Sequence, residues 1–126
     1  MGRLMTERGY VPEAIVSSPA ARAKETAELV CAEIAPAAPI SLDERIYEAA
    51  PRHLLEVISD IDTAGSAMIV GHNPGMEALV KMLTGRDAEM PTAALAVVEL
   101  SIDDWGSVSP GCGQLIDVIR PKEARR

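Results

Sequence analysis

The stretch Ala67-Met68-Ile69-Val70-Gly71-His72-Asn73-Pro74-Gly75 joins a short apolar run to a polar turn with two glycines. The apolar run predicts a buried strand. Asn73-Pro74 marks the start of a helix that runs to Leu83, before Gly85. A strand followed by a helix is the repeating unit of α/β folds. The stretch therefore predicts an α/β architecture with a polar turn at the carboxyl end of a strand.

Three further runs continue this pattern along the chain: Ala14–Ser17, Leu95–Leu100 and Gln114–Ile119. The last two are separated by turn residues without room for a helix, which predicts an antiparallel hairpin or edge pair. The other strands alternate with helical stretches, as parallel strands do. The expected sheet is therefore mixed, with mostly parallel strands.

Two amphipathic stretches between the strands predict helices. The first covers Pro19–Ile34, where Ser18 can cap the helix and Pro19 suits the first helical position. The second covers Pro51–Ile61. Spacings of three and four residues place apolar side chains on one face of each helix. The expected buried residues are Ala23, Ala27, Val30, Cys31 and Ile34 in the first and Leu54, Ile58 and Ile61 in the second.

Length and composition restrict the function. A chain of 126 residues, of which 48% are hydrophobic and 25% charged, is expected to form one globular domain over 1–126. The net charge of −7 has the wrong sign for neutralising a nucleic acid backbone, and the 2% of aromatic residues exclude base-stacking platforms. No apolar run approaches the ~20 residues that span a bilayer, so a cytoplasmic protein without a membrane anchor is expected. Cys31 and Cys112 lie in no metal-binding motif, which predicts reduced thiols and no metal site.

Arg22 is the first candidate for ligand binding. It ends the turn Ser17-Ser18-Pro19-Ala20-Ala21-Arg22, within about one turn of the start of the first expected helix. The helix dipole disfavours a cation there by ~0.3–1 kcal/mol, and a bound anion would compensate. An arginine that is solvated, or paired with a nearby carboxylate, explains the residue equally well.

The turn Gly71-His72-Asn73-Pro74-Gly75 gives the stronger signal. His72 directly follows a strand, at the edge where open α/β sheets bind ligands, and the glycines allow close backbone approach. An imidazole there can hydrogen-bond a phosphoryl group or another oxyanion. Asn73 can cap the helix and joins Arg22 as a candidate for substrate binding. The alternative for His72 is a ring that only ties the loop to backbone carbonyls.

Glu44 is a weaker candidate. It lies in the charged turn Asp43-Glu44-Arg45-Ile46-Tyr47-Glu48, where Glu44 or Glu48 could serve as a proton donor over a cleft. A solvated turn with an internal ion pair is the alternative. His53 fits the solvated side of its helix. Ser17 and Ser18 lie outside any nucleophile-elbow motif, so a serine hydrolase is not supported.

Several short motifs follow one another in a fixed order: Ser17-Ser18-Pro19 with Arg22-Ala23, Thr26-Ala27-Glu28, Asp43-Glu44-Arg45 with Tyr47-Glu48, Val70–Gly75, Pro91–Leu95, Pro110–Gly113 and Ile119-Arg120-Pro121. Together they resemble the histidine phosphatase superfamily, and within it the SixA-type phosphohistidine phosphatases. The resemblance extends over essentially the whole chain.

This resemblance implies a three-layer α/β/α fold of the phosphoglycerate-mutase-like kind. It also implies phosphoryl transfer through a phosphohistidine intermediate, with no metal or cofactor. By position, Arg22 would grip the phosphate, His72 would stabilise the transferring phosphoryl group, and Glu44 matches the place of an acid. The implied substrate is a phosphohistidine protein or a small phosphoester. A non-catalytic phosphate-binding or interaction module is the alternative function.

The family's nucleophilic histidine stands in an Arg-His pair at the end of an N-terminal first strand, which this sequence does not show. Met1–Arg8, followed by Gly9, looks like the last turns of a helix whose beginning is absent. We therefore expect an N-terminally incomplete domain that lacks its first strand. A short protein that binds phosphate without turnover, or one with an unexpected nucleophile, would explain the sequence otherwise. If the short chain is real, its exposed sheet edges predict a homo-oligomer.

Overall fold

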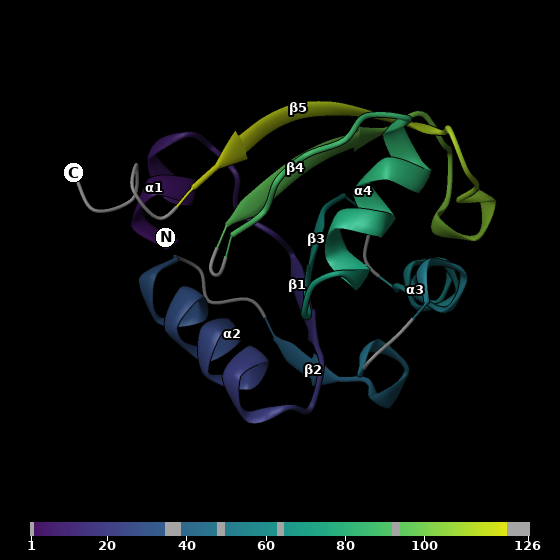
Figure 1. Ribbon diagram of the computed structural model, residues 1–126. Coiled ribbons are helices and arrows are strands. Elements are labelled where there is room, and N and C mark those ends of the chain that lie inside the picture. The colour runs from purple at the N-terminus through teal and green to yellow at the C-terminus, as the bar shows by residue number, and fades with distance from the viewer. Residues whose placement is uncertain (1, 35–38, 48–49, 63–64, 92–93, 121–126) are drawn as a thin grey trace. The chain divides into compact units, whose positions relative to one another are not determined.

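The chain forms two units in the computed structural model, which describes residues 2–34, 39–47, 50–62, 65–91 and 94–120 (Figure 1). The first unit contains Met1–Tyr47 and Asp62–Gly71, and the second contains Glu48–Ile61 and His72–Arg126. A parallel sheet lies in the first unit and an antiparallel hairpin in the second. The expectation of one domain over 1–126 stays a prediction beside this division.

The first unit is built on a parallel sheet of three strands in the order β2-β1-β3. Its strands are β1 (Ala14–Ser17), β2 (Ile40–Leu42) and β3 (Ala67–Val70). The register places Ser17 opposite both Leu42 and Val70, so the three strands end together. The predicted bounds of β1 and β3 are confirmed, whereas β2 was not expected from the sequence.

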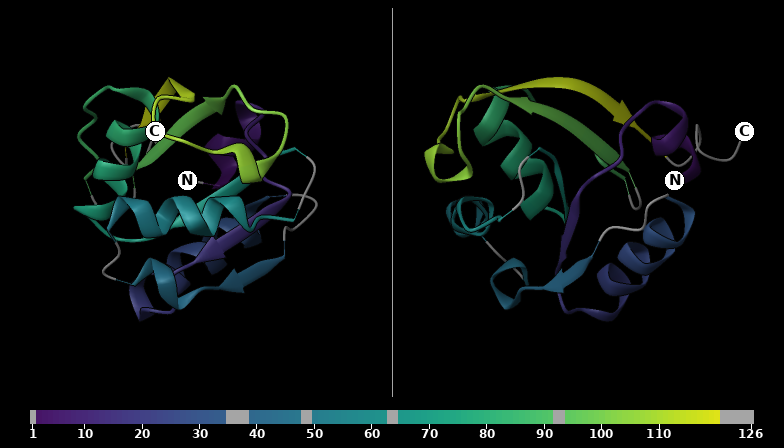
Figure 2. Two further views of the ribbon diagram at one scale, coloured as in Figure 1. Left: turned by 90° about the vertical axis from the view of Figure 1, so that its right-hand side faces the viewer. Right: turned by 180° about the vertical axis from the view of Figure 1, so that it is seen from behind.

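Helix α2 (Ala21–Glu33) packs against all three strands of this sheet (Figure 2). Small alanines on the buried face of this helix allow close packing against the sheet, and Ile15 of β1 is fully buried. The predicted stripe is confirmed except at Cys31, which is only half-buried. The buried members are Ala23, Ala27, Val30 and, just after the helix, Ile34.

Helix α1 (Gly2–Glu7) packs against α2. It ends as the sequence predicts, because Gly9 adopts a positive φ of 79°. The Gly9 amide then donates to the Thr6 carbonyl oxygen (3.1 Å), and the Tyr10 amide donates to the Met5 carbonyl oxygen (2.8 Å). This pattern satisfies carbonyl groups that the end of a helix leaves without partners.

The second unit consists of the antiparallel strands β4 (Leu95–Leu100) and β5 (Gly113–Ile119) with helices α3 (Pro51–Ser59) and α4 (Gly75–Thr84). Helix α4 packs against both the hairpin and α3 (Figure 1). Gly85, with a φ of 75°, ends α4 as predicted. Leu54 and Ile58 are buried as expected, but Ile61 is half-buried because α3 ends before it.

The antiparallel pairing of the last two strands is confirmed. Within the described residues, β4 and β5 hydrogen-bond to each other and form a sheet of their own. From the sequence, we expected this pair to join the parallel strands in one mixed sheet. The short connection between β4 and β5 determines that they pair with each other, but it does not determine the partners of their outer edges.

In the described part of the chain, no helix is long and apolar enough to cross a membrane.

Candidate functional site

The carboxyl ends of the three parallel strands meet around Ser17 and Ser18, which are both 0% exposed. The Ser17 carbonyl oxygen accepts a hydrogen bond of 2.9 Å from the amide of Asp43, the residue after β2. The Ser18 amide donates a hydrogen bond of 2.9 Å to the carbonyl oxygen of Val70, the last residue of β3. These two bonds fix the segments that leave β1, β2 and β3 relative to one another.

Helix α2 begins two residues later than the sequence predicts, after a turn that follows β1. Ser18 Oγ accepts a hydrogen bond of 3.2 Å from the Ala20 amide, and Ser17 Oγ donates one of 2.9 Å to the Ser18 carbonyl oxygen. α2 starts at Ala21, and its N-cap residue Ala20 provides no side-chain cap. The expectation that Ser18 caps a helix starting at Pro19 is wrong, because Ser18 Oγ closes a local turn with the amide two residues on.

Arg22 is exposed in the first turn of α2, and its guanidinium has no hydrogen bond or ion pair within the described residues. The first backbone bond of the helix runs from the Lys24 amide to the Ala20 carbonyl oxygen (3.0 Å). The amides of Ala21, Arg22 and Ala23 precede it and carry part of the positive end of the dipole. Among the described residues, Arg22 is therefore not paired with a carboxylate. A cation in the first turn of a helix, where amides lack helix partners, suits a bound anion.

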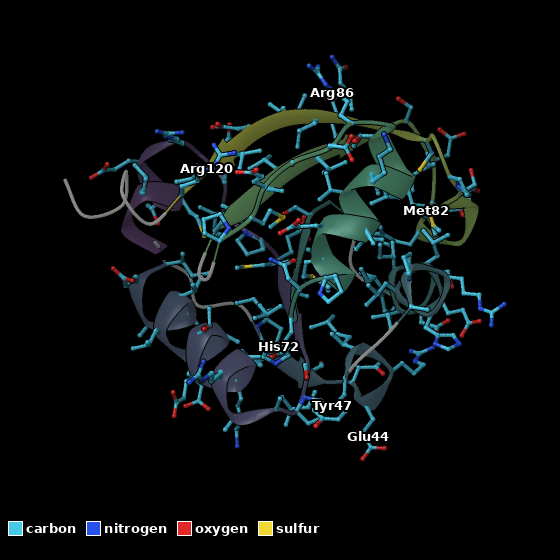
Figure 3. All side chains as sticks on the ribbon, in the orientation of Figure 1. Glu44, Tyr47, His72, Met82, Arg86 and Arg120 are labelled. Carbon is cyan, nitrogen blue, oxygen red and sulfur yellow. The ribbon has the colours of Figure 1, made fainter. Side chains whose placement is uncertain are left out.

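Glu44 opens η1 (Glu44–Ile46), the 3-10 turn that follows β2. Asp43 Oδ1 accepts a hydrogen bond of 2.9 Å from the Arg45 amide, and Arg45 Nη2 lies 2.7 Å from Asp43 Oδ2. The turn therefore has the internal ion pair that was the alternative for this segment, but Glu44 takes no part in it. Glu44 is exposed, and its carboxylate points away from η1 (Figure 3). Glu48, the other candidate acid, lies outside the described residues.

The Asp43–Arg45 pair makes stability depend on pH. Side-chain hydrogen bonds from Arg45 hold the pKa of Asp43 below its ordinary value of 3.8, helped by the Arg45 amide and charge and opposed by burial. A depressed pKa contributes stability that is present above 3.8 and is lost as the pH falls through the lowered value. Asp43→Asn should therefore lower the unfolding free energy near neutral pH by about 0.5–1 kcal/mol, given the pair's partial exposure. Urea unfolding over a pH series checks this, and a difference that persists in strong acid would contradict it.

His72 belongs to the second unit, at the entry to α4. Its carbonyl oxygen accepts a hydrogen bond of 3.2 Å from the Met76 amide. The side chain is exposed, and the imidazole has no partner among the described residues. The alternative in which the ring ties the loop to backbone carbonyls is therefore not observed in that part of the chain.

Asn73 uses both polar atoms of its side chain within the second unit. Its Oδ1 accepts a hydrogen bond of 3.2 Å from the Glu77 amide in the first turn of α4. The expected helix start at Asn73-Pro74 is wrong, because α4 begins at Gly75 with Pro74 as its N-cap residue, but Asn73 still provides an acceptor for an amide of the first turn. Its Nδ2 donates to the Met90 carbonyl oxygen. Glu77 Oε1 in turn accepts a hydrogen bond of 3.3 Å from the Met90 amide. Sequence reasoning missed Glu77 and Met90, and contact of Asn73 with a substrate stays a prediction.

The structure brings the turns that carry Arg22 and Glu44 to one edge of the parallel sheet, through the bond between Ser17 and Asp43. His72 and Asn73 are neighbours in the second unit. Arg52-His53, an adjacent arginine and histidine, lies exposed in the first turn of α3, and in the described part of the chain no strand leads directly into this pair. Thr92, Ala93 and Pro121, which belong to the motifs quoted above, lie outside the described residues.

Among the described residues, no group of three or more His, Cys, Asp or Glu side chains could hold a metal ion. Cys31 and Cys112 are both free thiols and half-buried.

The sequence of this chain matches those of curated relatives over most of its length. Two proteins of Mycobacterium tuberculosis, uncharacterized protein Rv1276c (strain ATCC 25618 / H37Rv) and uncharacterized protein MT1313 (strain CDC 1551 / Oshkosh), are each 32% identical over 122 residues. The match covers 87% of this chain and 74% of each relative. Uncharacterized protein At3g52155, chloroplastic, from Arabidopsis thaliana is 25% identical over 96% of this chain and 62% of its own length. No protein-family model matches the chain.

Solved structures have folds similar to that of this chain. The structure assigned to phosphohistidine phosphatase SixA from Agrobacterium tumefaciens has a TM-score of 0.77 and 29% identity, covering 95% of this chain and 75% of that one. A protein histidine phosphatase SixA complexed with tungstate has a TM-score of 0.75 and 20% identity, covering 98% and 78%. The predicted α/β fold with a mostly parallel sheet is confirmed. The chain belongs to the same family as the mycobacterial proteins Rv1276c and MT1313, and it has the histidine phosphatase fold.

Proposed function

We propose that this chain is a phosphoryl-transfer domain of the phosphohistidine phosphatase type, which acts on a phosphohistidine protein or a small phosphoester. The observation that carries the proposal is Arg22 in the first turn of α2, whose guanidinium has no hydrogen bond or ion pair within the described residues. A cation at a helix N-terminus that follows a buried strand end suits a dianion. Likeness to the SixA structures supports the same reading.

Chain position supports a phosphate-binding role for His72. His72 follows Val70, the last residue of β3, by two residues. It therefore comes directly after the carboxyl end of a parallel strand, where open α/β sheets bind ligands. We assign His72, like Arg22, a role in binding a phosphoryl group.

The chemistry needs little more than charge stabilisation and correct positioning. Phosphoryl transfer places negative charge on three equatorial oxygens, and arginine can hydrogen-bond two of them through its planar guanidinium. His72 would donate a hydrogen bond to the same group, and its contribution would grow as charge develops in the transition state. Glu44 would protonate the leaving group, and Asn73 would fix the loop that carries His72 or contact the substrate.

A phosphate-binding or interaction module without turnover is the second candidate. In the histidine phosphatase superfamily, the nucleophilic histidine stands in an Arg-His pair at the end of a strand. The pair Arg52-His53 lies in helix α3 instead, and this position favours binding without turnover. Such a module would use Arg22 and His72 to hold a phosphorylated protein. Binding is common to both functions, whereas release of phosphate is specific to the enzyme.

The proposal is tested by titrating the chain with sodium tungstate and with inorganic phosphate in a calorimeter. Tungstate is a tetrahedral oxyanion like phosphate, and the SixA structure named above is complexed with it. We expect one binding site per chain for which the two anions compete, with sodium nitrate at equal ionic strength as the control. Absence of saturable binding by both oxyanions would overturn both functions.

A further inference from the structure

The loop that carries His72 is fastened to a segment far along the chain by a ring of three hydrogen bonds within the second unit. Asn73 Nδ2 donates to the Met90 carbonyl oxygen, the Met90 amide donates to Glu77 Oε1 (3.3 Å), and the Glu77 amide donates to Asn73 Oδ1 (3.2 Å). Both backbone polar groups of Met90 are thus held by side chains from the entry to α4. We call Asn73, Glu77 and Met90 the Met90 clamp.

The segment held by the clamp has a second anchor. Arg120 Nη2, just after β5, donates a hydrogen bond of 3.2 Å to the carbonyl oxygen of Glu89, the residue before Met90. The segment between α4 and β4 is therefore attached to the hairpin on one side and to the His72 loop on the other. This part of the chain contains motifs that the proposed phosphate chemistry does not use.

We propose that Glu77 is a positioning residue, which holds the His72 loop in a binding-competent conformation through the Met90 clamp. The imidazole of His72 has no partner of its own among the described residues, so its position depends on the backbone of its loop. Glu77 is half-buried in the first turn of α4 and supplies the acceptor for the Met90 amide. This role deepens the proposed function, on which it rests, because a preorganised donor binds an oxyanion more tightly than a mobile one.

The two histidines of the chain allow a direct test by NMR of their imidazole groups. His72 reports on the loop, and His53, exposed on α3, serves as an internal control. Glu77→Ala should move or broaden the His72 ring signals without ligand, leave those of His53 in place, and weaken binding of inorganic phosphate by about ten-fold. Glu77→Gln keeps the acceptor oxygen, so its spectrum and its affinity should stay close to those of the parent chain.

Controls separate positioning from general stability. Glu56→Ala removes an exposed glutamate from α3 in the same unit and should change neither the His72 signals nor phosphate binding. Circular dichroism confirms that each variant is folded under the conditions of the NMR experiment. In Asn73→Ala/Glu77→Ala, the loss should be smaller than the sum of the single losses, because both side chains hold Met90.

The outcomes distinguish the two proposals. If the parent chain shows no change in the His72 signals with phosphate, the proposed function fails, and the spectra without ligand still decide the role of Glu77. Unaltered His72 signals and unaltered phosphate affinity in Glu77→Ala would overturn the positioning role. An equal loss in Glu77→Gln and Glu77→Ala would also overturn it, because the acceptor oxygen would then not be what matters.

Discussion

Arg22→Ala is expected to lower the affinity of the chain for inorganic phosphate by about 100-fold, which corresponds to about 3 kcal/mol. Arg22 is exposed in the first turn of α2, the turn whose amides no helix bond uses, and its guanidinium has no protein partner among the described residues. Charge-assisted hydrogen bonds to a dianion are about twice as strong as neutral ones. Isothermal titration calorimetry at fixed ionic strength measures the effect.

Two variants sharpen this measurement. Lys24→Ala removes a positive charge from an exposed position two residues further along α2, so it controls for the general loss of positive charge. Arg22→Lys keeps the charge but loses the planar pair of donors, and should bind with intermediate affinity. Equal losses in Lys24→Ala and Arg22→Ala would show that Arg22 acts only through long-range electrostatics, and would remove it from the site.

The strands of the parallel sheet show what a single sequence can and cannot indicate. β1 and β3 could be predicted because each is a short apolar run directly followed by turn residues. β2 has only three residues, with Ser41 between two apolar ones, and such a segment resembles a loop. Its position depends on pairing with β1, including the bond from the Ile15 amide to the Pro39 carbonyl oxygen (2.9 Å). That pairing is tertiary and leaves little local pattern.

The residues of the candidate site also fall into those that a single sequence can indicate and those that it cannot. Arg22 and His72 could be selected from the sequence because each follows an expected strand, where α/β folds bind ligands. Glu77 and Met90 could not, because their bond joins positions 13 residues apart and uses a backbone amide that nearly every residue possesses. Ser18 was given the wrong partner because its hydroxyl can bond either a helix amide or that of a local turn, and local geometry decides.

His72→Ala is expected to slow phosphate release from a phosphohistidine peptide by about 100-fold to 1000-fold. The imidazole is exposed at the entry to α4 and has no partner among the described residues, so it is available to a ligand. A donor aimed at the transferring phosphoryl group contributes most when charge develops on the equatorial oxygens. Release of phosphate from the peptide and from a generic phosphomonoester is measured for both chains, together with phosphate affinity by calorimetry.

His53→Ala is the matched control, because it removes the other histidine of the chain from an exposed helix position. Activity in the parent and in His53→Ala, but not in His72→Ala, would identify an enzyme that uses His72 and whose nucleophile is not His53. Loss of activity in both variants would implicate His53 as an unexpected nucleophile. Phosphate binding without turnover, lost in His72→Ala, would favour the non-catalytic module. Unchanged phosphate affinity in His72→Ala would remove His72 from the site.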